Sequence, residues 1–260
     1  MTAIVRMEAR GLARGSALMG GLLAATTAVL LLVFPNIKAE AETVIDAYPP
    51  FMITLLGIEE LDTLEGFAAG YVIPFGVTLL GGVYLAYVAS SMVVDDVRTR
   101  RMDLLLANPV SRESVVLQKF AALWVPTASL VGVVFVLVVG GAAAIGESID
   151  LGRFLLALAW AVAYLLVCGA IGMLLSVALD RVNAAQAGAI GVVFVLYLLE
   201  GLSEMDPSYE VLGWIAPSRY YDPNAALLRG EVAVADVGVL LLGCLAILGA
   251  SVVVFARRDL

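Results

Sequence analysis

The chain has 260 residues, of which 62% are hydrophobic and only 15% are charged, a balance far from that of soluble globular proteins. Its 23 acidic residues outnumber its 15 basic residues, giving a net charge of −8, and it contains no histidine. The composition excludes a soluble domain, and the lack of histidine excludes HExxH zinc proteases and catalysts built on a Ser–His pair.

Six stretches carry no charged residue over about the 20 residues that a helix needs to cross a bilayer core. Their apolar residues occupy every side instead of alternating, which is typical of membrane-spanning helices and not of barrel strands. We therefore predict an all-α membrane protein, with residues 1–260 forming one polytopic transmembrane domain. The predicted spans are 16–36, 67–94, 120–145, 154–179, 182–200 and 237–256.

Before the first span, Arg6, Arg10 and Arg14 recur every four residues, with apolar residues largely on the other side. This spacing predicts a short amphipathic interfacial helix in the headgroup layer, which bends into the first span near Gly15. A cleavable signal peptide ending at Ala39–Glu40–Ala41 is the alternative. We expect a retained span, because the apolar run exceeds the roughly 7–15 residues of a signal-peptide core.

The basic residues indicate the orientation of the chain in the cell membrane. If the N-terminus is cytoplasmic, eleven of the 15 Lys and Arg residues lie inside, as the positive-inside rule requires. Both termini are then cytoplasmic, residues 95–119 form the largest cytoplasmic loop, and residues 37–65 and 201–236 form the outer loops.

The acidic residues gather on the other side. Sixteen of the 23 acids lie in the loops placed outside. We interpret them as a hydrated surface typical of a salt-loving organism such as a halophilic archaeon, with a cation-collecting vestibule as the alternative.

The two long outer loops have different compositions. The first is acidic, and we expect a short helix in Thr54–Leu64. The second, 201–236, combines three prolines with tryptophan and tyrosine, which favour the membrane interface. It predicts two short outer helices before the last span, resting on or dipping into the outer leaflet, or else a folded external cap.

The end of the fifth span and this second loop supply residues for a pathway or outer gate. Charged residues are scarce inside the spans, and a carboxylate there would be functional by default. An interfacial carboxylate in water is the plainer interpretation of Glu200. The candidate residues are Glu200, Trp214, Pro217, Tyr220 and Tyr221.

The stretch RTRRMDLLLANPVSRESVVLQK, residues 98–119, holds five of the 15 basic residues between two apolar runs. Its leucines and arginines predict a short amphipathic helix that ends at Asn108–Pro109. Ser111 can cap a new helix, with Glu113 in its first turn, that continues through Lys119 into the third span. Such a helix fits a groove on a partner, or it docks on the membrane surface and sets the topology; composition does not choose between them.

The sequence RRMDLLLANPVSRESVVLQKFAAL resembles the segment after the second span of ABC-transporter permeases of the type-2 exporter family. The outline of the chain is similar too, with six spans and the aromatic stretch WIAPSRYYDP before the last one. Members usually carry Gly-Thr ahead of the leucines, where this chain has Arg100–Arg101. The matching residues are Leu104, Leu105, Leu106, Ala107, Pro109, Val110, Ser111, Arg112 and Lys119.

The resemblance implies an exporter of a hydrophobic or amphipathic substrate, or of an ion. Two six-span subunits, as a homodimer or a heterodimer, would pair with two cytoplasmic ABC ATPase subunits that hold the ATP and Mg²⁺. The loop 95–119 would then be the coupling helix that contacts the ATPase. The contact residues implied are Arg98, Arg100, Arg101, Met102, Asp103, Leu104, Leu105, Leu106, Pro109 and Arg112.

The rest of the sequence is consistent with a subunit that draws its energy from another chain. It has no GxxxxGK[ST] phosphate-binding loop, and its two cysteines lie in predicted spans without metal-ligand spacing. We expect no catalytic, cofactor-binding or metal-ligating residue, no enzyme activity and no nucleic-acid partner. The alternatives are a membrane scaffold that recruits another cytoplasmic protein through the same loop, and an ATP-independent carrier.

Overall fold

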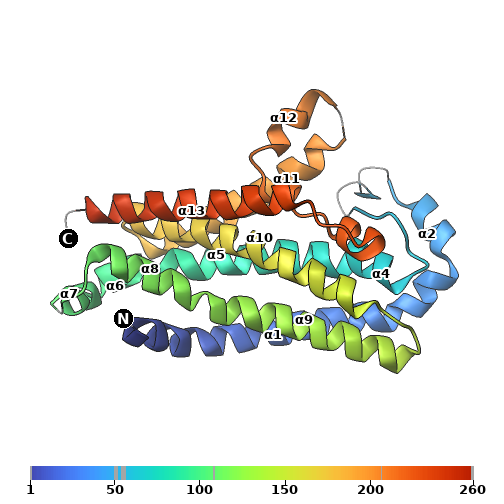
Figure 1. The fold of residues 1–260 in the computed structure, drawn as a ribbon, viewed down its shortest axis with the longest axis horizontal. Coiled ribbons are helices and arrows are strands. Elements are labelled where there is room, and N and C mark those ends of the chain that lie inside the picture. The colour runs from blue at the N-terminus through green and yellow to red at the C-terminus, as the bar shows by residue number, and fades with distance from the viewer. Residues whose placement is uncertain (1, 50–51, 54–56, 108, 206, 259–260) are drawn as a thin grey trace.

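The computed structural model describes residues 2–49, 52–53, 57–107, 109–205 and 207–258, whose regular elements are all helices (Figure 1). Among these residues, six helical segments are long and apolar enough to cross a membrane, which confirms the predicted all-α, six-span fold. They are Ile4–Ala39, Leu64–Arg98, Arg112–Ile145, Leu151–Ala178, Val182–Ser203 and Val234–Ala256. Both termini lie at one end of the bundle, here called the terminal end, and the opposite end is called the distal end (Figure 1).

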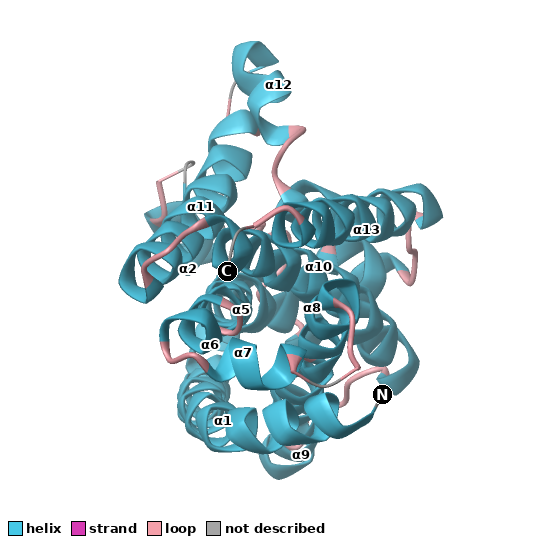
Figure 2. Cartoon of the chain, turned by 90° about the vertical axis from the view of Figure 1, so that its left-hand side faces the viewer, coloured by secondary structure: helices cyan, strands magenta, loops and turns pink. Residues whose placement is uncertain are grey.

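The first helix, α1 (Thr2–Ala39), is continuous. The residues predicted as an interfacial helix are its first turns, and Figure 2 shows this N-terminal part crossing the terminal end of the bundle. The remainder packs along α9 (Trp124–Ile145) and leads to α2 (Ala41–Ala47) at the distal end.

The second span consists of α4 (Leu64–Phe67), η1 (Ala68–Gly81) and α5 (Gly82–Ser91). The η1 segment is a π-helix that contains Pro74, whose nitrogen carries no hydrogen to donate. π-Helical segments are rare and occur frequently at functional sites.

The prediction of a short helix in Thr54–Leu64 is wrong for residues 57–63, which form no helix. Residues 54–56 lie outside the described residues. Gly57 has a φ of 61°, which interrupts any helix there. Thr63 is extended, and its side chain accepts a hydrogen bond from the Gly66 N–H at 3.1 Å, so that a new helix, α4, begins after it.

The loop at the terminal end forms α6 (Val94–Arg98) and α7 (Arg101–Leu106), and α8 (Arg112–Ala122) follows. Ser111 caps α8 as predicted, because its Oγ accepts the Ser114 N–H at 3.2 Å. The helix continues into the third span as predicted, within the helical segment Arg112–Ile145, with an interruption at Leu123 between α8 and α9. Pro126 explains the break, because it offers no N–H to the carbonyl of Ala122 one turn earlier.

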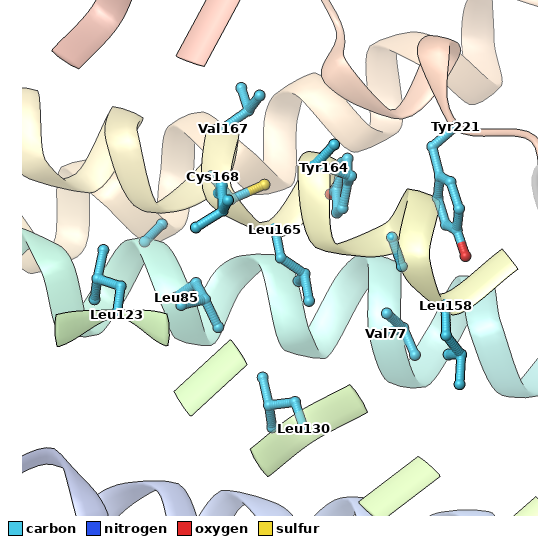
Figure 3. Close-up of a cluster of buried hydrophobic side chains, with 14 of the residues drawn as sticks. Val77, Leu85, Leu123, Leu130, Leu158, Tyr164, Leu165, Val167, Cys168 and Tyr221 are labelled. Carbon is cyan, nitrogen blue, oxygen red and sulfur yellow. The ribbon is translucent and has the colours of Figure 1, made fainter. Parts of the chain in front are cut away.

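The helix α10 (Leu151–Ala178) is the centre of the core and packs along both α5 and α13 (Val234–Ala256). Figure 3 shows its buried side chains between neighbouring helices, among them Tyr164, whose hydroxyl donates to the carbonyl of Thr78 at 3.0 Å. A Cβ at Gly172 would clash with the carbonyl of Ala86, so glycine permits α5 and α10 to approach closely. Asp150 caps α10 by accepting the Arg153 N–H at 3.0 Å, and this hydrogen bond lowers the pKa of the Asp150 carboxyl.

The helix α11 (Val182–Ser203) packs along α5 and is followed, among the described residues 204–205 and 207–233, by four short helical pieces. These are η2 (Pro207–Tyr209), α12 (Glu210–Gly213), η3 (Pro217–Tyr220) and η4 (Ala225–Arg229). Figure 1 shows α12 projecting from the side of the bundle, whereas Figure 3 places Tyr221 against α10. The Tyr221 hydroxyl donates to the carbonyl of Ala157 at 3.2 Å, and its burial raises the pKa of the phenol. Short helices are therefore present before the last span, as predicted, although the described residues form more than the two that were expected.

Candidate functional site

The helix α7 presents most of the predicted partner-contact residues at the terminal end. Leu104 is 71% exposed, and Leu105 and Leu106 are half-buried. Arg98, Arg100, Arg101, Asp103 and Pro109 are exposed as well. Apolar and basic side chains thus share one small surface, here called the α7 surface: residues 98, 100, 101 and 103–106.

Met102 does not share that exposure. It is only 1% exposed and belongs to the buried core. Its side chain therefore anchors α7 to the bundle, so that this residue is not available as a direct contact for a partner.

The turn between α6 and α7 has an unusual backbone conformation at Arg100, whose φ is 56°. A residue with a Cβ pays roughly 1–2 kcal/mol in this left-handed region, whereas glycine does not. Arg100 occupies one of the two positions at which type-2 exporter permeases, which this chain resembles, usually carry Gly-Thr.

A buried ionic cluster, here called the Lys119 cluster, lies behind α7. The Lys119 Nζ is 2.5 Å from Glu8 Oε1 and 2.7 Å from Asp96 Oδ2, and the lysine side chain is 1% exposed. These three residues belong to α8, α1 and α6 respectively. Since a buried charge must be paired, the cluster fixes the three helices to one another.

A second buried contact joins α6 to the central helix. The Ser176 Oγ on α10 accepts hydrogen bonds from the backbone N–H groups of Val93 and Val94, at 2.9 and 3.2 Å. Those two residues lie where α5 ends and α6 begins. Ser176 therefore satisfies two buried donors at the joint that leads into α7.

Arg112, another predicted contact residue, is engaged within the chain. Its Nη1 donates to the backbone carbonyl of Arg258, just beyond α13, at 2.5 Å. Arg258 in turn donates to the Val177 carbonyl at 2.8 Å and pairs with Asp180. Arg112 thus holds the C-terminal end of the last span to α8.

A hollow of about 640 Å³ separates the N-terminal part of α1 from α6 and α7. Leu104, Leu105 and Arg101 line one side of it, so the α7 surface continues into this hollow. Its other lining residues are Met7, Glu8, Gly11, Leu12, Val88, Ser91, Met92, Asp95 and Asp96.

The residues proposed from sequence for a pathway or outer gate divide between two separate spaces. Glu200 and Tyr221 line a polar cavity of about 270 Å³, here called the distal cavity. Its remaining lining residues are Gly57, Glu59, Pro74, Thr78, Tyr197, Glu204, Ser218, Arg219, Asp222, Pro223 and Asn224. Trp214, Pro217 and Tyr220 instead line an apolar groove of about 440 Å³ between α10, α11 and α13.

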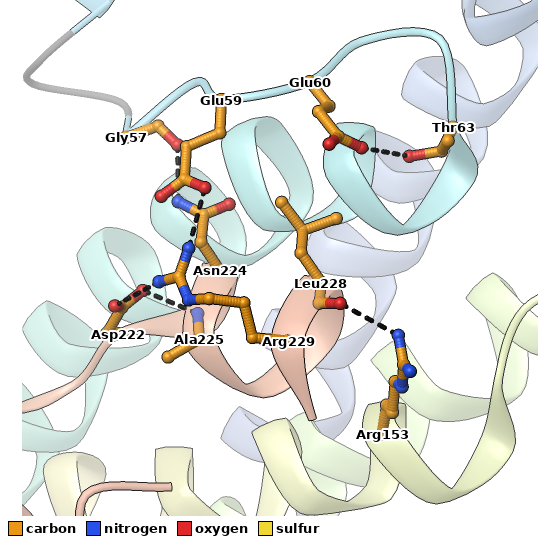
Figure 4. Close-up of polar contacts among 10 residues, drawn as sticks. All are labelled: Gly57, Glu59, Glu60, Thr63, Arg153, Asp222, Asn224, Ala225, Leu228 and Arg229. Carbon is orange, nitrogen blue, oxygen red and sulfur yellow. Dashed lines mark hydrogen bonds and ion pairs between the residues drawn. The ribbon is translucent and has the colours of Figure 1, made fainter. Parts of the chain in front are cut away.

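An ion-pair network lies at the edge of the distal cavity (Figure 4). Arg229 is 2.9 Å from Glu59 Oε2 and 3.0 Å from Asp222 Oδ2, and all three side chains are partly exposed. Asn224 donates through its Nδ2 to the carbonyl of Gly57 at 2.7 Å, which joins the second outer loop to the first.

Sequence reasoning missed Glu8, Asp96, Ser176, Glu204 and Asn224. One signal was available for the first two: Lys119 follows Val115 and Val116 on the buried face of α8, where a lysine requires acidic partners. Among the described residues, no group of three or more His, Cys, Asp and Glu side chains is placed to hold a metal ion.

Comparison with known proteins gives one match. The model of a family described as ABC-2 family transporter protein matches residues 19–260. A search of curated proteins finds none that matches.

Proposed function

Because this chain belongs to the ABC-2 transporter family, we propose that it is the permease subunit of an ATP-driven exporter whose separate ATPase docks on the α7 surface. The observation that carries the docking proposal is the 71% exposure of Leu104 beside three exposed arginines at the end of a membrane bundle.

The α7 surface has the chemistry of a helix that fits a groove on another protein. Its leucines supply apolar area to bury, and Arg98, Arg100 and Arg101 supply positive charge for acidic groups on the rim. Such charges add mainly orientation and association rate, whereas burying the exposed leucine surface against a partner would supply apolar binding free energy.

The contacts behind α7 support a transmitting role. Met102 anchors α7, Ser176 holds the joint between α5 and α6, and the Lys119 cluster ties α6 to α1 and α8. A displacement of α7 by an ATPase would therefore move the ends of three spans together, as a rigid-body change biased by ATP.

The proposal places the terminal end, with both chain termini, in the cytoplasm of the cell. The positive-inside distribution of lysine and arginine supports this orientation. It also includes a second permease subunit, identical or related, and an amphipathic, hydrophobic or ionic substrate. ATP and Mg²⁺ would be held by the ATPase and not by this chain.

Charge reversal on the α7 surface tests the docking. The double variant Arg100→Glu, Arg101→Glu keeps the spans intact, and we expect the co-purified ATPase to fall at least tenfold, because two attractive contacts become repulsive. The measurement is the molar ratio of ATPase to permease after purification from membranes, with the amount of inserted permease as reference.

The matched control is Arg181→Glu, an exposed arginine in the turn between α10 and α11 at the same end. Its ATPase ratio should equal that of the wild type. An unchanged ratio in the double variant would remove the α7 surface as the docking site. A wild-type chain that purifies with a cytoplasmic protein lacking a nucleotide site would favour a scaffold.

A further inference from the structure

We propose that the distal cavity binds a small organic cation with a protonated amino group. The cavity lies between η1, the end of α11 and residues 218–224 of the second outer loop. The contacts described below support the cavity as a binding site. That this site receives the exporter's substrate rests in addition on the proposed function.

The cavity has more carboxylates than the neighbouring arginines neutralise. Of the four that line it, Glu59 and Asp222 pair with Arg229. The one lining arginine, Arg219, reaches instead to Glu210, with its Nη2 at 3.2 Å from Oε1.

Glu200 and Glu204 have no arginine or lysine of their own, although the charge of Arg219, on the wall of the same cavity, acts on Glu200 from a distance. Neither forms an ion pair with any lysine or arginine of the described residues, within the 4.0 Å that defines one. Glu200 lies in the last turn of α11 and Glu204 caps the end of this helix, with its backbone N–H donating to the Glu200 carbonyl at 3.2 Å. The two side chains are therefore one turn apart on the same face and repel each other when both are ionised. A bound cation would relieve that repulsion.

A buried amide oxygen is the independent observation that points to a ligand. Asn224 lines the cavity and is 5% exposed. Its Nδ2 donates a hydrogen bond to the carbonyl of Gly57, whereas its Oδ1 is buried and has no hydrogen-bond partner among the described residues. A buried acceptor left unpaired costs about 1–3 kcal/mol, so a donor is expected to reach it.

These groups select the ligand by charge and by hydrogen bonding. Two carboxylates and an amide oxygen are all acceptors, and an ammonium group offers three donors with a positive charge. An anion would be repelled by the same carboxylates. A metal ion is a poor fit, because no three His, Cys, Asp or Glu side chains of the described residues are placed to hold one.

The cavity has room for a molecule larger than a simple ion. Its volume of about 270 Å³ is roughly nine times the ~30 Å³ that one water occupies in the liquid. The wall formed by Pro74 and Thr78 belongs to the π-helix η1, and this rare geometry is frequent at ligand sites.

Calorimetric titration of the full-length permease in lipid nanodiscs with 1,4-diaminobutane tests the proposal. The neutral analogue 1,4-butanediol and the anion succinate are titrated in parallel. We expect saturable binding of the diamine alone, and at least tenfold weaker binding in Glu200→Gln and in Asn224→Leu. The first variant removes a charge, and the second removes the unpaired acceptor together with the hydrogen bond to the Gly57 carbonyl.

The matched control is Glu231→Gln, an exposed residue of the same loop that does not line the cavity; it should bind the diamine like the wild type. Both cavity variants must show the wild-type unfolding midpoint, and Glu204→Gln replaces any that does not. Equal binding of diamine and diol, equal loss in Glu231→Gln, or no binding to the wild type would overturn the proposal. The titration contains no ATPase and no ATP, so its result does not depend on whether the ATPase docks on the α7 surface. Likewise, a failed titration would leave the co-purification result unchanged.

Discussion

The two ends of the bundle differ in one respect: the terminal end has a buried ionic cluster besides exposed pairs such as Arg98–Asp95, whereas the ion pairs described at the distal end are all partly exposed. At the terminal end, Lys119 is sealed between Glu8 and Asp96 with 1% of its side chain exposed. At the distal end, Arg229 joins Glu59 and Asp222 with 43% of its side chain exposed, and the pair Lys38–Glu147 is open as well. The distances between the charged atoms are similar at both ends, so the degree of burial sets the free energy needed to separate each pair. Breaking a buried pair leaves a charge without a partner, whereas water replaces the partner of an exposed charge.

The difference suggests a division of labour. If the terminal end receives the motion of an ATPase, as proposed above, it must move as one piece, and the Lys119 cluster with Ser176 would supply that rigidity. An end that admits or releases a ligand must rearrange, and partly hydrated pairs permit it. Substitutions ranked by expected effect test this contrast.

The largest effect is expected for Lys119→Met, which leaves two carboxylates at the terminal end without their cation. Breaking a buried pair in this way costs about 3–5 kcal/mol. Thermal unfolding in detergent, followed with a thiol-reactive fluorogenic dye, measures it, because Cys168 and Cys244 are both free and buried. The unfolding midpoint should fall sharply.

The matched control is Lys38→Met. Its pair with Glu147 has a separation of 2.6 Å, close to that of Lys119, but side-chain exposures of 40% and 30%. An exposed pair contributes about 0–1 kcal/mol. Equal losses in the two variants would mean that burial is not what separates the two ends.

An intermediate effect is expected for Ser176→Ala at the joint between α5 and α6. The change removes the one oxygen that accepts the N–H groups of Val93 and Val94, and a buried donor left unpaired costs about 1–3 kcal/mol. The same dye assay measures it. Ser251→Ala is the control, because the Ser251 hydroxyl only donates to the Ile247 carbonyl of its own helix. A fall in unfolding midpoint for Ser176→Ala no larger than that for Ser251→Ala would contradict a rigid link between this joint and α10.

The smallest effect is expected for Arg229→Gln at the edge of the distal cavity. Its pairs are exposed, so the loss of unfolding free energy should be about 0–1 kcal/mol and should vanish at 1 M salt, where the Debye length is about 3 Å. Unfolding midpoints of wild type and variant at low and high salt measure this. A large, salt-independent loss would show that the distal network is as rigid as the Lys119 cluster.

Much of the α7 region was predictable from sequence because its signals are local. Pro109 ends one helix and Ser111 caps the next, within a few residues of chain. The acid excess of the outer loops predicted a hydrated surface or a cation-collecting vestibule; the choice between them and the origin from a salt-loving organism stay predictions. Met102 could not be placed, since its helix has only six residues and the neighbours decide which of them is buried.

The sequence by itself determined that this chain is an all-α bundle of six spans, because a segment in hydrocarbon must satisfy its backbone hydrogen bonds within its own helix. Only the tertiary structure decided which charges are sealed and which stay hydrated. Lys119 and Glu8 are separated by 111 positions in the chain, and Asn224 and Gly57 by 167. Such pairings depend on how whole helices pack, and no local pattern encodes them.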